Sequence, residues 1–245
     1  GNDTLNAASG NDSLVGNGGD DLFIFSGANI SALDTITGGA GSADELQFTS
    51  GTFNSSTATL TALSGVERFV MNSNGAHNFT VADAYYAGIT GGVITMTTTS
   101  NTGVTFSGST IATTSNRLDL TGGTGNDVLT SGAGADTLSG GNGDDSLTGG
   151  SGVDILTGGA GIDRFRFGPN TTDSGIGAGN RDIVADFVQG TDRLDLGPFI
   201  GTVNFRAGGL GETNYVGGAM QVAYQQVSGN TILFFDQTGD NVTDM

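Results

Sequence analysis

A nine-residue alternation of glycine-rich and apolar segments runs through residues 122–166. Its five consecutive units are GGTGNDVLT, SGAGADTLS, GGNGDDSLT, GGSGVDILT and GGAGIDRFR. The eighth position is always large and apolar, and the residues there are Leu129, Leu138, Leu147, Leu156 and Phe165. In each unit six turn-forming residues precede three residues centred on the apolar one. This order is typical of a tight turn followed by a short strand.

Two such units bring the chain back to the side on which it started, so about 18 residues form one coil of a flattened solenoid. Stacked coils are expected at ordinary strand spacing, roughly 4.8 Å. The pattern predicts two parallel sheets with inward-pointing apolar side chains, Leu129, Leu147 and Phe165 in one sheet and Leu138 and Leu156 in the other. Because one unit is too small to bury its own apolar face, only a stack of neighbours can do so.

A looser run of the same kind opens the chain as GNDTLN, AASGNDSLV and GNGGDDLFI. Its apolar positions are Leu5, Leu14, Phe23, Ile36 and Leu46. Residues 47–116, between the runs, lack the repeat and are rich in Thr, Ser and Asn. They contain short alternating pieces such as HNFTV and GVITMTT, which predict short strands. This segment is expected to be a β-rich insert or a continuation of the solenoid.

Composition changes the picture because it removes the usual sources of stability. The chain has 45 glycines, 2 prolines, no cysteine and only 7% aromatic residues, so it loses much backbone entropy and has little to bury in return. Its 25 acidic residues against 7 basic ones argue against nucleic acid and anionic membranes as partners. No apolar run approaches the roughly 20 residues of a transmembrane helix, so no transmembrane segment is expected. Folding is therefore expected to depend on something that the chain binds.

The sixth position of every unit is aspartate, and stacking would place these carboxylates in columns. Two carboxylates about 5 Å apart repel by roughly 3 kcal/mol at an effective dielectric constant near 20. A divalent cation between successive turns would reverse the sign of this contribution. The available ligands are carboxylate and backbone carbonyl oxygens, which suit calcium better than magnesium or zinc. The alternative is a disordered, solvated acidic linker, but a linker has no reason to keep Asp and Leu in phase over five units.

The GGxGxDxUx units resemble the RTX (repeats-in-toxin, hemolysin-type) calcium-binding family. The resemblance implies an all-β fold, a parallel β-roll or β-solenoid with several calcium ions between its turns. It also implies secretion through bacterial type I machinery and folding outside the cell. Carried over to this sequence, the carboxylate ligands are Asp127, Asp136, Asp145, Asp154 and Asp163, and in the first run Asp3, Asp12, Asp21, Asp34 and Asp44. The turn glycines with carbonyl ligands are Gly123, Gly125, Gly132, Gly134, Gly141, Gly143, Gly150, Gly152, Gly159 and Gly161. At the variable fifth position, Asp20 and Asp144 are expected to tune charge rather than bind calcium.

A second resemblance covers the C-terminal part of the chain. The segment DIVADFVQGTDRLDL resembles the element that caps RTX rolls in serralysin-type secreted proteins, and GNTILFFDQTGDNVTDM resembles the strand pair that follows it. Asp182, Asp186 and Asp192 are further candidate calcium ligands, with strand capping as the alternative. The expected organisation is a first roll over residues 1–46, the insert over 47–116, a second roll over 117–180 and a capping β region over 181–245.

Catalytic motifs are absent from the sequence, which contains neither HExxH nor GxSxG. The only histidine, His77, lies in a Ser/Asn-rich stretch and is expected to be solvated. We therefore expect a non-catalytic, extracellular calcium-binding module, a fragment of a type I secreted protein. One alternative is a surface-layer or adhesin segment that assembles with copies of itself at the cell surface. Another is the C-terminal part of a secreted protease, lipase or polysaccharide-modifying enzyme whose catalytic domain lies outside this chain.

Overall fold

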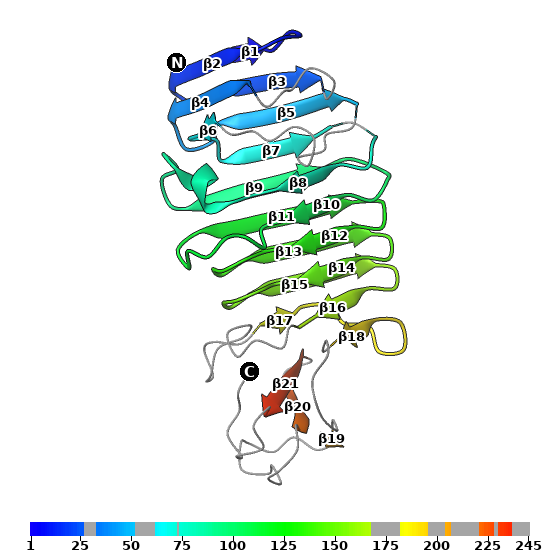
Figure 1. Ribbon diagram of the computed structural model, residues 1–245. Helices are drawn as coiled ribbons and strands as arrows, with labels where there is room; N and C mark the ends of the chain where they lie inside the picture. The colour runs from blue at the N-terminus through cyan, green and yellow to red at the C-terminus, as the bar shows by residue number, and fades with distance from the viewer. Residues whose placement is uncertain are drawn as a thin grey trace.

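The computed structural model describes residues 1–26, 33–51, 62–72, 74–167 and 182–195, together with the backbone of three strands nearer the C-terminus. The described chain is built almost entirely of short strands that stack along one axis (Figure 1). Apart from strands it contains one 3-10 turn, η1 (Asp83–Tyr86). No helix among these residues is long and apolar enough to cross a membrane.

Every second strand of the roll, from β1 to β17, belongs to one nine-stranded parallel sheet. In spatial order its strands are β1 (Thr4–Asn6), β3 (Leu22–Ser26), β5 (Glu45–Ser50), β7 (Arg68–Met71), β9 (Val93–Thr98), β11 (Arg117–Gly123), β13 (Thr137–Asn142), β15 (Ile155–Ala160) and β17 (Ile183–Val184). The order along the sheet is the order along the chain, so each coil adds one strand beside the previous one.

The intervening strands form two further parallel sheets. The first contains β2 (Ser13–Gly18), β4 (Thr35–Ala40) and β6 (Ala62–Ser64). The second contains β8 (Asn78–Thr80), β10 (Thr105–Ser107), β12 (Val128–Thr130), β14 (Ser146–Thr148), β16 (Arg164–Arg166) and β18 (Arg193–Asp195). Strands of the nine-stranded sheet alternate along the chain with strands of the other two sheets. This is the topology of a parallel β-roll, and it confirms the predicted fold class.

The register follows the nine-residue repeat. Leu129 pairs with Leu147, which pairs with Phe165, on β12, β14 and β16. Leu138 pairs with Leu156 on β13 and β15 of the opposite sheet. All five side chains are completely buried, so the two rows of apolar residues close the space between the sheets as the periodicity predicts.

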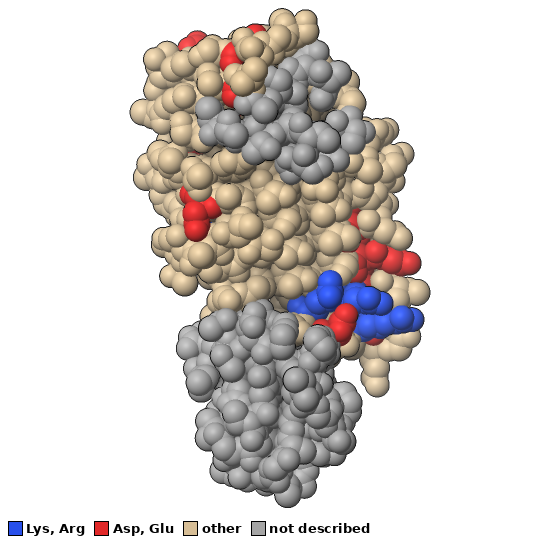
Figure 2. Space-filling model, in the orientation of Figure 1, with Lys and Arg blue, Asp and Glu red and all other residues tan. Residues whose placement is uncertain are grey.

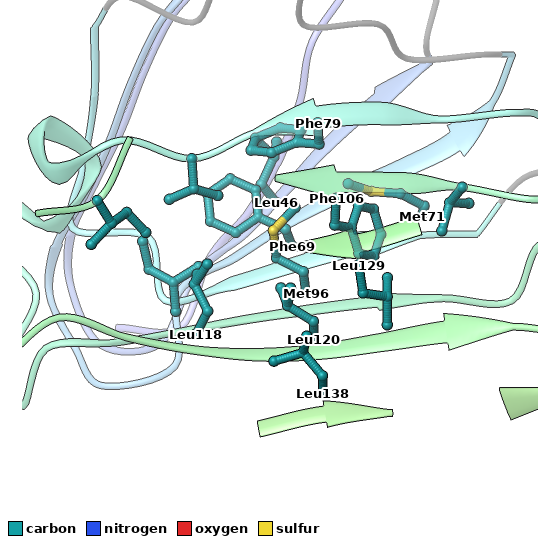
Figure 3. Close-up of a cluster of buried hydrophobic side chains, with 14 of the residues drawn as sticks. Leu46, Phe69, Met71, Phe79, Met96, Phe106, Leu118, Leu120, Leu129 and Leu138 are labelled. Carbon is teal, nitrogen blue, oxygen red and sulfur yellow. The ribbon is translucent and has the colours of Figure 1, made fainter. Parts of the chain in front are cut away.

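Residues 47–116 contribute strands to the same ladders as the two repeat runs. Strands β7 and β9 lie between β5 and β11 in the nine-stranded sheet, and β8 and β10 lead into β12 on the other side. Large side chains fill the core here. Phe69, Met71 and Met96 come from one wall and Phe79 and Phe106 from the other, and all are at most 1% exposed (Figure 3).

Beyond the roll, three strands form a separate sheet, described here by its backbone. Strand β19 (Asn204–Arg206) pairs in parallel with β20 (Gln221–Val227), and β20 pairs antiparallel with β21 (Asn230–Asp236). The antiparallel pair matches the strand pair predicted near the C-terminus. The rest of the region over 196–245, and residues 168–181, lie outside the described residues.

Candidate metal centre

The roll has two turn edges, and each carries a column of acidic residues. The first edge consists of the turns before the even-numbered strands β2, β4 and β8 to β18. The second edge consists of the turns before the odd-numbered strands β1 to β17. The column position is the residue that precedes the strand in each repeat unit. The first edge has Asp12, Asp34, Asp127, Asp145, Asp163 and Asp192 at this position. The second edge has Asp3, Asp21, Asp44, Asp136, Asp154 and Asp182.

Successive aspartates in a column are joined by hydrogen bonds from backbone to side chain. The N–H of Asp127 donates to Oδ1 of Asp145 at 2.7 Å, and the N–H of Asp145 donates to Oδ1 of Asp163 at 2.9 Å. On the second edge the N–H of Asp136 donates to Oδ1 of Asp154 at 2.8 Å. Each column carboxylate therefore fixes the coil before it, and one of its two oxygens is used in doing so.

The same ladder runs through the first repeat run. The N–H of Asp3 donates to Oδ1 of Asp21, and the N–H of Asp21 donates to Oδ1 of Asp44, both at 2.7 Å. On the other edge the N–H of Asp12 donates to Oδ1 of Asp34 at 2.8 Å. The irregular turns that precede Asp34 and Asp44 thus bring these residues into the columns as the regular turns do.

The second carboxylate oxygen faces the first glycine of its own turn. A Cβ atom on Gly122 would overlap both Oδ2 of Asp127 and the carbonyl oxygen of Gly140 in the next coil. The equivalent pair of oxygens one coil further on, Asp145 Oδ2 and the Gly158 carbonyl oxygen, would be overlapped by a Cβ atom on Gly140. The missing side chains of Gly122 and Gly140 therefore leave cradles in which a carboxylate oxygen and a carbonyl oxygen converge.

Several of these Oδ2 atoms are buried without a hydrogen-bond partner among the described residues. They include the Oδ2 atoms of Asp12, Asp21, Asp44, Asp145 and Asp163. An unpartnered buried carboxylate oxygen is costly unless a cation or a donor satisfies it. The sequence analysis treated turn glycines as carbonyl donors only and missed the first-position glycines. The signal available was that glycine begins four of the five perfect units.

Burial raises the pKa of the column carboxyls. The pKa of Asp145 rises to about 7, with burial as the main cause and the charges of Asp127, Asp163 and Asp144 as further contributors. The pKa of Asp136 rises to about 6, again mainly through burial, while the hydrogen bond from the Leu118 N–H opposes the rise. Burial likewise raises the pKa values of Asp44, Asp127 and Asp163. Without a bound cation, burial therefore disfavours the charged form of these carboxyls.

This charge lies inside the turns rather than on the surface. Asp21, Asp44, Asp145, Asp154 and Asp163 are each at most 2% exposed. Acidic side chains are accordingly sparse on the face drawn in Figure 2, although the chain has 25 acidic residues. A solvated acidic linker would expose its carboxylates, so the structure excludes that alternative for the described turns.

Basic residues gather at the C-terminal end of the described roll, beside β16 and β18 (Figure 2). Arg164, Arg166 and Arg193 lie on these strands and are exposed, with Arg164 paired to Arg193 in the ladder. Arg166 forms an ion pair with Asp195 at 3.5 Å. These arginines point outward from the strands.

The three further candidates near the end of the roll have two different roles. Oδ1 of Asp182 accepts the N–H of Asp154 at 2.9 Å, and Oδ1 of Asp192 accepts the N–H of Asp163 at 3.1 Å. Both residues thus extend the columns by one coil. Asp186 instead accepts the N–H groups of Gly158 and Gly159 with its two oxygens, at 2.8 and 2.7 Å. Asp186 therefore caps a turn.

The fifth-position residues form a second, exposed ladder. Asp144 is exposed, and its Oδ1 accepts the N–H of Ile162 in the next coil at 2.9 Å. Asp20 accepts the N–H groups of Ser42 and Ala43 in the same way, at 3.0 and 3.2 Å. These side chains join coils in addition to carrying charge, a role that the sequence analysis did not foresee.

The columns change character in the middle of the roll. On the second edge Glu67 replaces aspartate, is buried, and accepts the N–H of Asp44 at 2.9 Å. Ile94 pairs with Leu118, and the Leu118 N–H donates to Oδ1 of Asp136, so these two apolar residues continue the column. Val104 does the same on the first edge, where its N–H donates to Oδ1 of Asp127. The apolar residues of the middle coils therefore fill part of the column with side chains that need no cation, whereas Glu67 keeps a carboxyl group there.

His77 occupies the same column on the first edge. The expectation that it is solvated is wrong, because it is only 1% exposed. It precedes β8 as Val104 precedes β10, and Asn78 pairs with Thr105 in the ladder. The Ser/Asn-rich surroundings concealed this register because the coils here are longer than the repeat.

The carbonyl oxygens of the second- and fourth-position glycines stack from coil to coil. The Gly123 carbonyl lies against Gly141, and the Gly141 carbonyl lies against Gly159. The Gly125 carbonyl approaches Gly143 in the same manner. Gly141, Gly143, Gly159 and four others of the ten proposed carbonyl donors have positive φ, namely Gly134, Gly150, Gly152 and Gly161. These glycines are needed for close approach between coils as well as for the turn conformation.

The residues present fit calcium in chemistry. In the part of the chain that the structure describes, no group of three or more acidic, histidine or cysteine side chains converges on one point. A cation there would take carboxylate oxygens from the columns and main-chain carbonyl oxygens from the glycine turns. On the first edge, Asp127 with the Gly140 carbonyl would hold one ion, and Asp145 with the Gly158 carbonyl would hold another. Such sets of hard oxygen ligands suit Ca²⁺.

Substituting Gly140 by alanine tests the cradle. Because its Cβ would overlap Asp145 Oδ2 and the Gly158 carbonyl, we expect the variant to lose about 1–3 kcal/mol of stability and to need more calcium to fold. Urea unfolding at fixed calcium measures the first effect. Gly18→Ala is the matched control, since its Cβ would meet only the Ala40 carbonyl at an ordinary 3.8 Å. Equal losses in the two variants would contradict the assigned cradle.

The raised pKa values predict the pH dependence of the calcium-free chain. The folded form holds the protons of Asp145 and Asp136 more tightly than the unfolded chain does, with pKa values of about 7 and 6 against about 3.9. Stability without calcium is therefore expected to rise as pH falls through this window and to level off near pH 4. Urea unfolding at pH 8, 7, 6 and 5 in calcium-depleted buffer checks this. A stability that falls over the same range would show that these carboxyls are not buried in the calcium-free fold.

Comparison with known proteins bears on the same turns. A family model, the RTX calcium-binding nonapeptide repeat, matches residues 1–29, 119–147 and 131–165. A search of curated proteins finds no match. The matched ranges hold the regular aspartate columns, and the coils with Glu67, His77, Ile94 and Val104 lie outside them. Residues 1–29 and 119–165 therefore carry repeats of the RTX calcium-binding nonapeptide family.

Proposed function

We propose that this calcium-binding RTX module is an extracellular, non-catalytic unit whose folding is coupled to calcium binding after type I secretion. The observation that carries the proposal is the pair of buried aspartate columns with unpartnered Oδ2 atoms. In the low calcium of the cytosol, repulsion of roughly 3 kcal/mol per carboxylate pair opposes stacking of the coils. Repeat coils that stay open at low calcium make the chain easier to pass through a secretion channel.

Calcium outside the cell would reverse this balance. Ions bound between turns neutralise the columns, so their binding free energy becomes folding free energy. Extracellular calcium modules bind with dissociation constants of about 10⁻⁴–10⁻³ M, which suits a switch that responds to leaving the cell. The absence of cysteine supports the same route, since no disulfide would form early and hinder threading.

The C-terminal region is proposed to cap the roll. Asp182 and Asp192 extend both columns by one coil, and the strand pair β20–β21 follows at a distance along the chain. Capping would protect the last coil, whose strands β17 and β18 end their sheets. The similarity of this region to the caps of serralysin-type proteins supports that role.

The test is far-UV circular dichroism during a calcium titration from a calcium-depleted start, with light scattering recorded alongside. The proposal expects a steep transition from coil to β structure at sub-millimolar to millimolar calcium, which magnesium does not reproduce. Scattering that stays flat supports a monomeric module, whereas scattering that rises with the transition would indicate assembly with copies of itself. A chain that is fully β-structured without calcium would refute coupled folding.

A further inference from the structure

The second edge of the first run ends against a turn that is not a repeat unit. The turn of residues 38–44 ends at Asp44, and in the next coil the turn before β7 shortens to residues 65–67 and ends at Glu67. Asp44 and Glu67 directly precede two paired residues of β5 and β7, so they occupy equivalent positions in the column. Both turns lie outside the ranges that match the family model.

The two turns nevertheless form a cradle of the kind seen between repeat turns. A Cβ atom on Gly38 would overlap both Oδ2 of Asp44 and the carbonyl oxygen of Gly65. One coil earlier, a Cβ atom on Gly16 would overlap Asp21 Oδ2 and the Gly38 carbonyl oxygen in the same way. The short turn therefore presents its carbonyl oxygen to the carboxylate of the preceding coil just as the repeat turn does.

The carboxylate oxygen in this cradle has no partner. Asp44 is fully buried, and its Oδ1 accepts the N–H of Asp21 at 2.7 Å, while its Oδ2 is buried without a hydrogen-bond partner among the described residues. Glu67 is 7% exposed, and its Oε2 accepts the Asp44 N–H at 2.9 Å. A buried carboxylate oxygen without a donor or a cation is costly, so this position calls for a bound group.

The described basic side chains do not supply that group. Arg68 follows Glu67 directly, but its guanidinium is turned to Glu45, with which it forms an ion pair at 3.4 Å, and its side chain is 49% exposed. Among the described residues no ion pair includes Asp44 or Glu67. Two acidic side chains are thus buried next to each other without a basic partner.

The Gly65 carbonyl is held in place by the protein itself. Gly65 has a φ of 62°, which favours glycine, and its N–H donates to the carbonyl oxygen of Ala87 at 2.9 Å. Ala87 directly follows η1, which belongs to the middle coils. One oxygen of the cradle is therefore positioned by a part of the roll that lacks the repeat.

We infer that the turns of residues 38–44 and 65–67 form a further calcium site, in which Asp44 Oδ2 and the Gly65 carbonyl oxygen are ligands and Glu67 supplies the second carboxylate. A cation there satisfies both oxygens of the cradle and offsets the repulsion between the two carboxylates, and oxygen ligands of this kind suit Ca²⁺. The inference rests on the proposed function, because it adds one ion to those of the repeat turns. This ion would join the first run to the middle of the roll.

The test is the number of calcium ions bound by the full chain, measured by equilibrium dialysis at a calcium concentration that just saturates the wild type. Asp44→Asn and Glu67→Gln are each expected to bind one ion fewer than the wild type. Their amide oxygens can still accept the N–H groups of Asp21 and Asp44, so the ladder is kept while a charge is lost. The double variant should also bind only one ion fewer, because both residues serve the same site.

Glu45→Gln is the matched control. It removes the same charge next to Asp44 in the sequence, but from a side chain paired with Arg68, so its ion count should equal that of the wild type. Circular dichroism of the dialysed samples verifies that each variant folds in calcium.

The outcomes separate the inference from the proposed function. If the wild type binds no calcium, the proposed function fails. If the wild type binds calcium and Glu67→Gln binds the same number of ions, the inference alone is overturned. A loss of two ions in the double variant would overturn it as well, since the two carboxylates would then hold different ions. So would a Glu67→Gln chain that does not fold in calcium, because the loss of one ion leaves the repeat turns intact.

Discussion

Replacing Asp145 by alanine is expected to raise the calcium concentration needed for folding at least about tenfold, whereas Asp144→Ala should change it little. Mutating a residue that only orients a metal ligand lowers metal affinity about 10–100-fold. Removing a ligand itself should therefore lower calcium affinity by at least as much. Asp145 is 2% exposed, accepts the Asp127 N–H and directs its Oδ2 toward the Gly158 carbonyl across the cradle. The exposed Asp144 accepts only the Ile162 N–H, a bond worth about 0.5–1.5 kcal/mol.

The measurement is the calcium midpoint of the circular dichroism transition for the two variants, which remove the same group from neighbouring positions. Asp145→Asn is a third variant for the same measurement. Its amide oxygen can still accept the Asp127 N–H, while the negative charge is lost. We therefore expect it to match or exceed the wild-type stability without calcium and to respond poorly to calcium. Equal midpoints for Asp145→Ala and Asp144→Ala would show that the column register is wrong.

The repeat runs were predictable from sequence because their period is short and strict. Each perfect coil spans 18 residues, as the bonds from Asp127 to Asp145 and from Asp136 to Asp154 show. A fixed period sets which apolar residues share a sheet, so the pairing of Leu129 with Leu147 and Phe165 followed directly. Stacking then fixes the aspartate columns without any further information.

The middle coils were not predictable in the same way. The bond from Val104 to Asp127 spans 23 residues, so the period changes where the repeat ends. The column residue also changes chemistry, from aspartate to Glu67, His77 or an apolar side chain. Packing decides these positions, and the sequence pattern of a single coil does not reveal which residue faces the core.

The role of the first-position glycines was hidden for another reason. Glycine in a turn is usually explained by its backbone freedom, yet Gly122 and Gly140 do not have positive φ. They are required because Asp127 and Asp145 fill the space of a side chain. Only the relative position of two residues five apart in the same turn shows this.

Calcium removal is expected to open the two ends of the roll while the middle keeps its structure. Amide hydrogen exchange in strands β12 to β16 should accelerate at least about 100-fold in calcium-depleted buffer, since roughly 3 kcal/mol of repulsion returns for each carboxylate pair. Strands β7 to β10 should change by much less. Only one of their four column positions, Glu67, carries a carboxyl group, and their core contains Phe69, Phe79 and Phe106, each at most 1% exposed.

Hydrogen exchange read by mass spectrometry on the full chain, with and without calcium, resolves these regions. Phe106→Ala is the control for the source of protection, because removing a buried phenylalanine costs about 3–5 kcal/mol and should abolish the calcium-independent protection of β8 to β10. Leu147→Ala, in the calcium-dependent run, should leave that protection unchanged. Uniform acceleration along the whole roll would contradict the prediction and make the chain one cooperative unit. A protected middle would instead mean that calcium extends a preformed stack of coils in both directions. Each new coil would then add its carboxylates beside a coil that is already ordered.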